Sequence, residues 1–355
     1  MTIPPSKPDP LPSPGDNLDR WARINYLGEI PDGSGRLSVP DLNGKMYLIK
    51  DGKPQIYLDV GVEFAPNFLN TKSLSSGFIF ATFAPDFNKT GKFYTAHTEA
   101  GPALNPKVPQ VKMPDLPYPQ NMPAQAVVTE WKATDPSASA FKGTRREALR
   151  LGFADTIHGL QQIDFNPTAQ PGDKDYGLLY IAAGDGGVVG EESPGVVTTV
   201  PQDLRVPQGK ILRIDPRGTN GANGNYGIPA DNPFVGKPGA ALGEIYASGL
   251  RDPVRFSWDS GNGHRMFLAT LASSRSNRST KYALETISGG ASRRARLYSR
   301  PATPLVVSLP RLLMTANTAT FILWWLSPMT HRRVSHRVGP AGTRWSAVSS
   351  TRVVM

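Results

Sequence analysis

Three short apolar segments decide the fold: Gln162-Ile163-Asp164-Phe165, Leu178-Leu179-Tyr180-Ile181-Ala182 and Lys210-Ile211-Leu212-Arg213-Ile214. Each is as long as an ordinary β-strand and contains the branched and aromatic residues that strands favour. Gly, Pro, Asn and Asp are frequent in the connections between them, as expected of turns and loops between antiparallel strands. This stretch predicts a small antiparallel sheet.

Segments of the same kind recur on both sides of this stretch. They occur in residues 22–60 (Arg23–Leu27, Arg36–Val39, Lys45–Ile49, Gln55–Leu58), in residues 77–134 (Phe78–Ala81, Lys92–Ala96, Ala126–Trp131) and in residues 244–268 (Glu244–Ala247, Arg255–Trp258, Met266–Leu268). Three or four short strands in every ~40–60 residues are typical of β-propeller blades. We therefore predict an all-β fold, an incomplete β-propeller of about four blades, over residues 22–269.

A β-sandwich is the alternative to the propeller. Two stacked sheets do not explain the recurring unit of apolar strand, Pro-Asp or Asn-Pro turn, and Leu-Tyr strand. Three insertions rich in Gly, Pro and Asn, at 100–123, 188–208 and 215–242, are too long for hairpin turns. Loops of that length often carry function, and in a propeller we expect them on one face, around the central channel.

One histidine and one aspartate are candidates for catalysis at that face. His158 lies just before the strand at Gln162, and an imidazole with a pKa of about 6.5 can accept a proton at neutral pH. Asp185 lies one hairpin later, in the turn Gly184-Asp185-Gly186-Gly187. We predict that the two side chains meet at one rim, because a carboxylate on the second ring nitrogen orients a catalytic base. A backbone-bonded loop histidine and an ordinary Asp-Gly turn are the alternatives.

A third candidate is the segment Gly249-Leu250-Arg251-Asp252-Pro253. It places a guanidinium at the end of a strand, where its fork can bind a carboxylate. An ion pair between Arg251 and Asp252 is the alternative. The glycines around Asp185 do not have the spacing of a dinucleotide or phosphate loop.

The net charge of +10 is carried by the end of the chain. Residues 270–355 contain thirteen Lys and Arg against Glu285 alone, which gives +12 and leaves −2 for residues 1–269. The basic excess therefore does not indicate a nucleic-acid partner. The sequence has no Cys, which excludes disulfides, zinc-thiolate sites and thiol nucleophiles.

The two ends of the chain lack targeting and membrane signals. Residues 1–21 are rich in Pro, contain no apolar signal-peptide core and are predicted to be disordered. The longest apolar run near the other end, Phe321–Leu326, is much shorter than the ~20 residues of a membrane helix. We predict no signal peptide in this chain and no membrane insertion.

Residues 270–355 differ in character from the rest. Ser and Thr fill 23 of these 86 positions, without strand alternation or a helical stripe. Loss of one base near codon 269 explains the change: in the other frame, residues 269–274 can encode Asp-Ile-Gly-Gln, and residues 286–297 can encode Asn-Phe-Gly-Trp-Arg-Glu-Pro-Glu-Gly-Thr-Phe. We predict that residues 270–355 are an out-of-frame, poorly ordered tail.

Taken together, residues 22–269 resemble the glucose/sorbosone dehydrogenase family, soluble sugar dehydrogenases that use pyrroloquinoline quinone (PQQ) on a six-bladed propeller. The motifs that carry the resemblance are His158 with Ile163 and Phe165, Leu179-Tyr180 with Gly184-Asp185, Gly209-Lys210-Ile211-Leu212-Arg213-Ile214-Asp215-Pro216, Ile228-Pro229-Ala230-Asp231-Asn232-Pro233-Phe234, and Gly249–Pro253. The strings in the other frame look like what the family places next.

The resemblance implies a reaction. His158 would take the proton from the C1 hydroxyl of an aldose while hydride passes to the quinone, which gives the lactone. Asp185 would orient His158, and Arg251 and Asp252 would contact the cofactor. Calcium would accompany PQQ, with unknown ligands in this chain. The resemblance also implies a small-molecule sugar substrate, an external electron acceptor of unknown identity, and a periplasmic or secreted location.

This sequence departs from the family pattern at several positions. Asp252 stands where the family usually has Asn, Ile157 stands where glucose-oxidising members have an acidic residue, and residues 188–192 lack a cofactor-contacting Gln. The alternative function is therefore a non-catalytic propeller that binds sugars or proteins. Because the later blades are absent from this reading frame, we expect this chain itself to be inactive.

Overall fold

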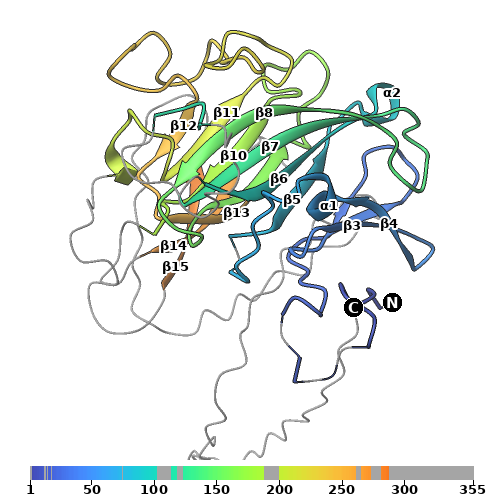
Figure 1. The fold of residues 1–355 in the computed structure, drawn as a ribbon. Helices are drawn as coiled ribbons and strands as arrows, with labels where there is room; N and C mark the ends of the chain where they lie inside the picture. The colour runs from blue at the N-terminus through green and yellow to red at the C-terminus, as the bar shows by residue number, and fades with distance from the viewer. Residues whose placement is uncertain are drawn as a thin grey trace, which may run out of the picture. The chain divides into compact units, whose positions relative to one another are not determined.

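The computed structural model describes residues 2–11, 13, 15–16, 18–73, 75–101, 113–117, 123–187, 200–260 and 265–272, and the backbone of 281–287. These residues belong to one compact unit that spans Thr2–Leu313. Within them the chain forms four antiparallel sheets and very little helix (Figure 1). The predicted all-β propeller with about four blades is confirmed.

Each sheet is one blade, and its strands follow one another in chain order. Blade 1 consists of β1 (Gly28–Glu29), β2 (Leu37–Pro40), β3 (Lys45–Lys50) and β4 (Lys53–Asp59). Blade 2 consists of β5 (Phe78–Phe83), β6 (Lys92–Ala100), β7 (Ala124–Ala133) and β8 (Gly143–Phe153). Blade 3 consists of β9 (Leu160–Phe165), β10 (Leu179–Ala183), β11 (Lys210–Ile214) and β12 (Ile245–Ser248). Blade 4 consists of β13 (Asp252–Trp258), β14 (Met266–Ala272) and β15 (Lys281–Ile287).

The helices are single turns in the connections: α1 (Val60–Glu63), α2 (Phe87–Thr90) and a 3-10 turn at Val200–Gln202. No helix in the described ranges is long and apolar enough to cross a membrane.

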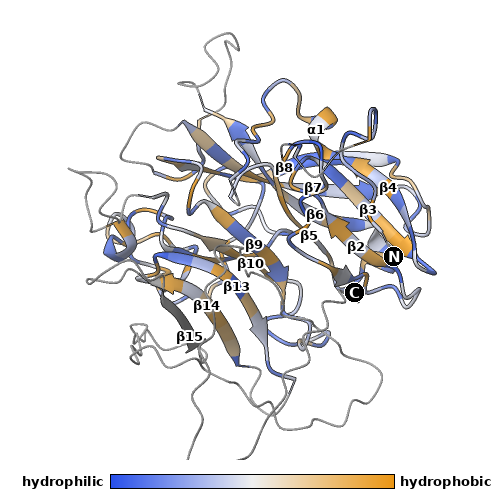
Figure 2. Cartoon of the chain, turned by 90° about the horizontal axis from the view of Figure 1, so that it is seen from below, coloured by the Kyte–Doolittle hydropathy of each residue, from blue (hydrophilic) through white to orange (hydrophobic). Residues whose placement is uncertain are grey.

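Apolar side chains hold neighbouring blades together. Met46 and Leu48 of blade 1 pack with Phe78, Phe93 and Trp131 of blade 2 in one buried cluster. In Figure 2 the apolar colour gathers in several strands, for example in β5 and β14. Burying a large apolar side chain contributes about 1.5–3 kcal/mol, so these inter-blade faces supply much of the stability.

Corresponding clusters join the later blades. Between blades 2 and 3 the cluster includes Tyr94, Leu149, Ile163 and Leu179, and between blades 3 and 4 it includes Tyr180, Phe256 and Met266.

The antiparallel order places the connections on two opposite rims. Those after β2, β4, β6, β8, β10 and β12 leave from one rim, which we call the site rim. Those after β1, β3, β5, β7, β9, β11 and β13 leave from the opposite rim. The insertions at 100–123 and 188–208 connect β6 to β7 and β10 to β11, and most of their residues lie outside the described ranges. The insertion at 215–242 joins β11 to β12 on the opposite rim. Our expectation that all three lie on one face is therefore wrong for the third.

Three local features differ from the sequence expectations. The expected strand Arg23–Leu27 is reduced to one bridge between Ile24 and Asp41. The main chain of Arg23 is bonded elsewhere, because its amide donates to Asp41 Oδ1 and its carbonyl accepts from the amide of Leu42. Strand β8 was not expected. Strand β15 lies beyond residue 269 and pairs along its whole length with β14.

The predicted boundaries between a disordered start (residues 1–21), the propeller (22–269) and an out-of-frame tail (270–355) stay predictions. Residue 269 falls inside β14, and residues 288–355, the greater part of the predicted tail, lie outside the described residues. In the Pro-rich start, Ser6 donates a hydrogen bond to Asp41 and accepts one from Lys45 Nζ on its carbonyl.

Candidate active site

His158 and Asp185 meet on the site rim. His158 lies in the connection between β8 and β9, Asp185 follows β10, and His158 Nδ1 is 2.9 Å from Asp185 Oδ1. The contact that the sequence predicted is therefore present, whereas its catalytic role stays a prediction. An ionised carboxylate can only accept a hydrogen bond, so in the neutral form of the ring this contact favours the tautomer with the proton on Nδ1 and the lone pair on Nε2. The His158 side chain is 14% exposed, which leaves the ring within reach of a ligand.

The backbone holds this histidine in an unusual conformation. His158 has φ of 47°, in the left-handed region that non-glycine residues rarely adopt. Its carbonyl accepts the amide of Gly186 at 2.9 Å. The bond ties the two turns that carry the imidazole and the carboxylate, and it compensates for the strain.

Asp185 is fixed on several sides and almost fully buried. Its amide donates to the carbonyl of Arg251 at 2.7 Å, and its Oδ1 also accepts the amide of Gly187 at 3.0 Å. Its second oxygen, Oδ2, is buried and has no hydrogen-bond partner among the described residues. The carboxylate is thus oriented toward His158 by main-chain groups from two neighbouring blades.

A second buried carboxyl lies beside the other ring nitrogen. Asp252 Oδ2 is 4.0 Å from His158 Nε2, and Asp252 Oδ1 accepts from Gln161 Nε2 at 2.9 Å. The same Gln161 nitrogen lies 2.6 Å from Ser75 Oγ. Burial raises the pKa of Asp252 above its ordinary value, while His158 and Gln161 act in the opposite direction. His158 therefore lies between two carboxyl groups.

Gly184 permits this close arrangement. A Cβ at this position would lie 2.2 Å from the carbonyl oxygen of His158 and 3.1 Å from Asp252 Oδ1, so no larger residue fits without a shift of the backbone. The Gly184 amide donates to Gly159 at 2.8 Å, and its carbonyl accepts from Gly209 at 2.9 Å. Leu250 continues the line by donating to Gly209 at 3.1 Å. These main-chain bonds link the segments that carry the site.

Lys210 is buried next to this line of bonds. Its Nζ donates to the carbonyls of Gln208 at 2.7 Å and Val200 at 3.1 Å, and the Gln208 side chain donates to the carbonyl of Gly152 at 2.7 Å. Burial lowers the pKa of Lys210 to about 7. The amine of Lys210 thus holds Val200 and Gln208 next to the line of main-chain bonds.

Of the four residues predicted from the sequence, the structure brings three side chains together: those of His158, Asp185 and Asp252. Arg251 joins them through its carbonyl, its side chain is half-buried, and its charge lowers the pKa of Asp252. Its contact with a cofactor stays a prediction. Four features of the site were not predicted from the sequence. They are the hydrogen bonds of Gln161 with Asp252 and Ser75, the need for glycine at position 184, and the burial of Lys210.

No group of three or more His, Cys, Asp or Glu side chains in the part of the chain that the structure describes is arranged to hold a metal ion.

Stacked antiparallel blades define a β-propeller, and a His–Asp contact lies on one of its rims. The chain belongs to the glucose/sorbosone dehydrogenase family, whose sequence model matches residues 26–267. The match ends two residues before the position at which the composition of the chain changes.

Two plant proteins are similar to this chain. It is 26% identical to the HIPL1 protein of Arabidopsis thaliana over 336 residues, which cover 83% of this chain and 44% of that protein. It is 30% identical to the HIPL2 protein of the same plant over 278 residues, which cover 68% and 38%. The chain thus spans less than half the length of these two relatives.

A solved structure shares the fold. The crystal structure of the putative oxidoreductase (glucose dehydrogenase) from Thermus thermophilus superimposes with a TM-score of 0.53 at 19% identity, covering 80% of this chain and 68% of that chain.

Proposed function

We propose that the site around His158 oxidises an aldose sugar at C1 to the lactone. The observation that carries this proposal is the Nδ1 contact of His158 with the buried Asp185, which leaves Nε2 as the free basic nitrogen. Nε2 accepts the proton of the C1 hydroxyl, and the C1 hydride leaves to a bound acceptor. Asp185 stabilises the imidazolium that forms, as an orienting carboxylate does in other base-plus-acid pairs.

The family resemblance implies PQQ with calcium as the acceptor, which supplies the hydride-accepting quinone carbon when bound. PQQ is a tricarboxylate, and among the described residues Arg251 is the cation next to the buried carboxyl of Asp252 in the chain. A buried carboxylate next to an anionic ligand is unfavourable unless further cations are present. The described residues therefore support the proton step, and on their own they do not fit the quinone.

A second candidate function is a non-catalytic propeller that binds sugars or proteins at the same rim. Asp252 favours it, because a buried carboxyl 4.0 Å from His158 Nε2 repels an anionic cofactor while it can still accept a hydrogen bond from a sugar hydroxyl. A PQQ titration separates the two candidates, and Asp252→Asn tightens PQQ binding if the proposed oxidation is right.

The proposal is tested by comparing the 355-residue chain, called the printed chain below, with the protein encoded after one base is restored near codon 269. We expect the restored protein to oxidise aldoses in the presence of PQQ and calcium, and the printed chain to be inactive. In the restored protein His158→Ala lowers the rate by about 10²–10⁴-fold. Asp185→Asn also lowers it, because the amide can present its NH₂ to Nδ1 and favour the wrong tautomer.

Asp51→Asn is the matched control, since Asp51 is an exposed turn residue on the opposite rim. Full activity of the restored His158→Ala protein would refute the base, and activity of the printed chain equal to that of the restored one would refute our account of residues 270–355. The family resemblance also supports a periplasmic or secreted location, which remains part of the proposal.

A further inference from the structure

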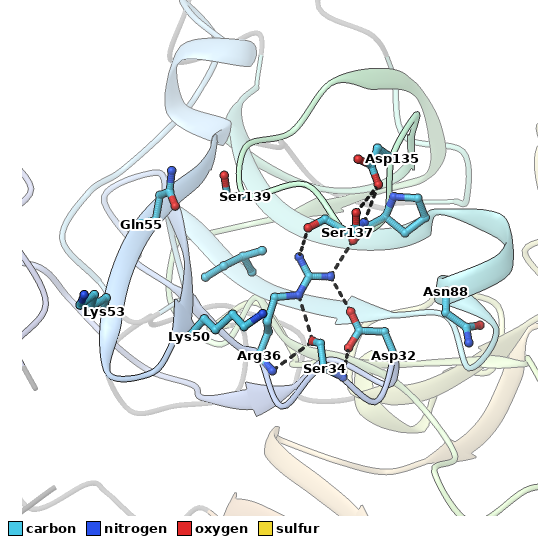
Figure 3. Close-up of a pocket in the computed structure, with 12 residues that line it drawn as sticks. Asp32, Ser34, Arg36, Lys50, Lys53, Gln55, Asn88, Asp135, Ser137 and Ser139 are labelled. Carbon is cyan, nitrogen blue, oxygen red and sulfur yellow. Dashed lines mark hydrogen bonds and ion pairs between the residues drawn. The ribbon is translucent and has the colours of Figure 1, made fainter.

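Two polar sites lie on opposite rims of the described part of the chain, and they differ in how their charges are balanced. On the rim away from His158 a pocket of about 560 Å³ opens between blades 1 and 2. At its centre Arg36 donates to Asp32 and to carbonyls of the 135–138 segment, as Figure 3 shows. The groups at the centre of that pocket therefore satisfy one another, whereas those beside His158 do not.

His158 and Asp252 present two hydrogen-bond acceptors side by side on the site rim. His158 Nε2 and Asp252 Oδ2 are 4.0 Å apart, too far for a hydrogen bond between them. With the ring proton on Nδ1, Nε2 accepts a hydrogen bond, and so does the oxygen of an ionised carboxyl. Neither atom has a hydrogen-bond partner within the described residues. A ligand at this position therefore has to bring a donor to each of the two atoms.

Neighbouring side chains fix the carboxyl of Asp252 without using this oxygen. Gln161 Nε2 donates to Asp252 Oδ1 at 2.9 Å and lies 2.6 Å from Ser75 Oγ. Gln161 is itself buried, so its amide is held in place. Oδ1 is thereby bonded inside the protein, and Oδ2 remains for a ligand.

The negative charge of Asp252 determines which kind of donor fits best. Its side chain is 4% exposed, and a carboxylate that is buried without a matching cation is unfavourable. Burial is the main cause that raises the pKa of Asp252. Besides His158, two charged groups act on this pKa, and Asp185 raises it more strongly than Arg251 lowers it. The site therefore favours a positively charged ligand group over a neutral one.

We propose that this site recognises a 2-amino-2-deoxy aldose, with the C1 hydroxyl at His158 Nε2 and the C2 ammonium at Asp252 Oδ2. This inference rests on the proposed oxidation at C1 and names its substrate class. The two donors are on adjacent carbons of one ring, so they reach two neighbouring acceptors at once. The hydroxyl gives its single proton to Nε2, and the ammonium supplies both a donor and the missing charge.

The same geometry ranks three related sugars. A 2-hydroxyl, as in glucose, donates to Asp252 without neutralising it. An N-acetyl group also lacks the charge and adds bulk beside a buried carboxyl. Since charge-assisted hydrogen bonds are roughly twice as strong as neutral ones, glucosamine should bind more tightly than glucose or N-acetylglucosamine.

The test measures the binding of these three sugars to the full 355-residue chain by isothermal titration calorimetry. At pH 7 an amine is largely protonated and an imidazole largely neutral. We expect glucosamine to bind about tenfold more tightly than either of the other sugars. In ¹⁵N NMR spectra the imidazole signal of His158, assigned by its loss in His158→Gln, should shift when glucosamine is added.

Two matched substitutions isolate the charge of Asp252. Asp252→Asn keeps an oxygen that accepts from Gln161 and removes the charge, so the preference for glucosamine over glucose should disappear while glucose still binds. Asp155→Asn removes a carboxyl from an exposed position in the same connection as His158 and should change the preference by less than about twofold.

Equal affinity for glucosamine and glucose, an unshifted His158 signal, or a preference that persists in Asp252→Asn overturns the proposal. Turnover by the protein with the restored base separates it from the proposed oxidation. If that protein is inactive and still prefers glucosamine, the oxidation is refuted and the amine site is supported. If it oxidises glucose and glucosamine equally well, the amine site is refuted and the oxidation stands.

Discussion

Replacing Lys210 with methionine tests whether a neutral or a charged amine lies beneath the candidate site. Burial lowers the pKa of Lys210 to about 7, against an ordinary value of 10.5. Since one pKa unit corresponds to about 1.36 kcal/mol, the charged amine costs the fold at most about 5 kcal/mol relative to the neutral one. Lys210→Met has no such group, and in exchange it leaves the carbonyls of Val200 and Gln208 without their donor.

The two proteins respond differently to pH. Below pH 7 the amine binds a proton in both the folded and the unfolded states, so the free energy of unfolding does not change with this group. Between about pH 7 and 10.5 the unfolded chain binds a proton that the folded chain lacks, and the free energy of unfolding of the parent protein rises with pH. The free energy of unfolding of the parent protein, minus that of Lys210→Met, therefore increases by up to about 5 kcal/mol between pH 6 and pH 10.5.

Urea unfolding monitored by tryptophan fluorescence at a series of pH values measures this difference. Lys174→Met is the matched control, because Lys174 is exposed and its substitution gives a difference that is independent of pH. If the difference in the free energy of unfolding between the parent protein and Lys210→Met stays constant to within about 0.5 kcal/mol from pH 6 to pH 10, the pKa of Lys210 is not lowered by folding. It would also count against the burial of a partly neutral amine beside Val200 and Gln208.

Two further predictions concern the site and the sheet below it. Gly184→Ala should lower the free energy of unfolding by about 1–3 kcal/mol, because its Cβ would meet the carbonyl of His158 at 2.2 Å. Gly15→Ala, where nothing lies within 4 Å, is the control, and equal urea midpoints for the two variants would contradict this prediction. Burial raises the pKa of Asp164 to about 6, so the free energy of unfolding of the parent protein falls as pH rises from 3.8 through that value. Asp164→Asn has no such loss. It should therefore be more stable than the parent protein by about 1–3 kcal/mol at pH 8, but not at pH 4. Thermal unfolding at the two pH values measures the gap, and a gap that does not widen with pH would count against it.

Most strands could be predicted from local pattern, and the exceptions have a common cause. Segments such as Leu179–Ala183 are apolar throughout, so their burial is visible in the sequence. Strand β8 begins with the polar run Gly143-Thr144-Arg145-Arg146-Glu147, which has no strand alternation. Its Arg150 is nevertheless buried, because Glu99 and Glu147 each pair with it at 2.9 Å. Glu99 comes from another strand, and its partnership cannot be read from spacing.

The candidate site was predictable to a similar extent. His158 and Asp185 lie one hairpin apart, and a hairpin brings residues near its two ends together, so their contact follows from topology. The approach of Asp252 and Gln161 depends on how blade 4 packs against blade 3. No local pattern encodes that packing. The same holds for Lys210, whose Nζ is bonded to the carbonyls of Val200 and Gln208.

The line of main-chain hydrogen bonds through Gly159, Gly184, Gly209 and Leu250 has an evolutionary consequence. Because peptide groups, not side chains, set the distance between the turns of the site, a side chain at the rim can be exchanged while the imidazole and its carboxylate keep their places. Ile157 precedes His158 in the chain, and Asp252 Oδ2 lies 4.0 Å from its Nε2. Single substitutions at these two positions could therefore alter which molecules the rim accepts while the architecture stays intact.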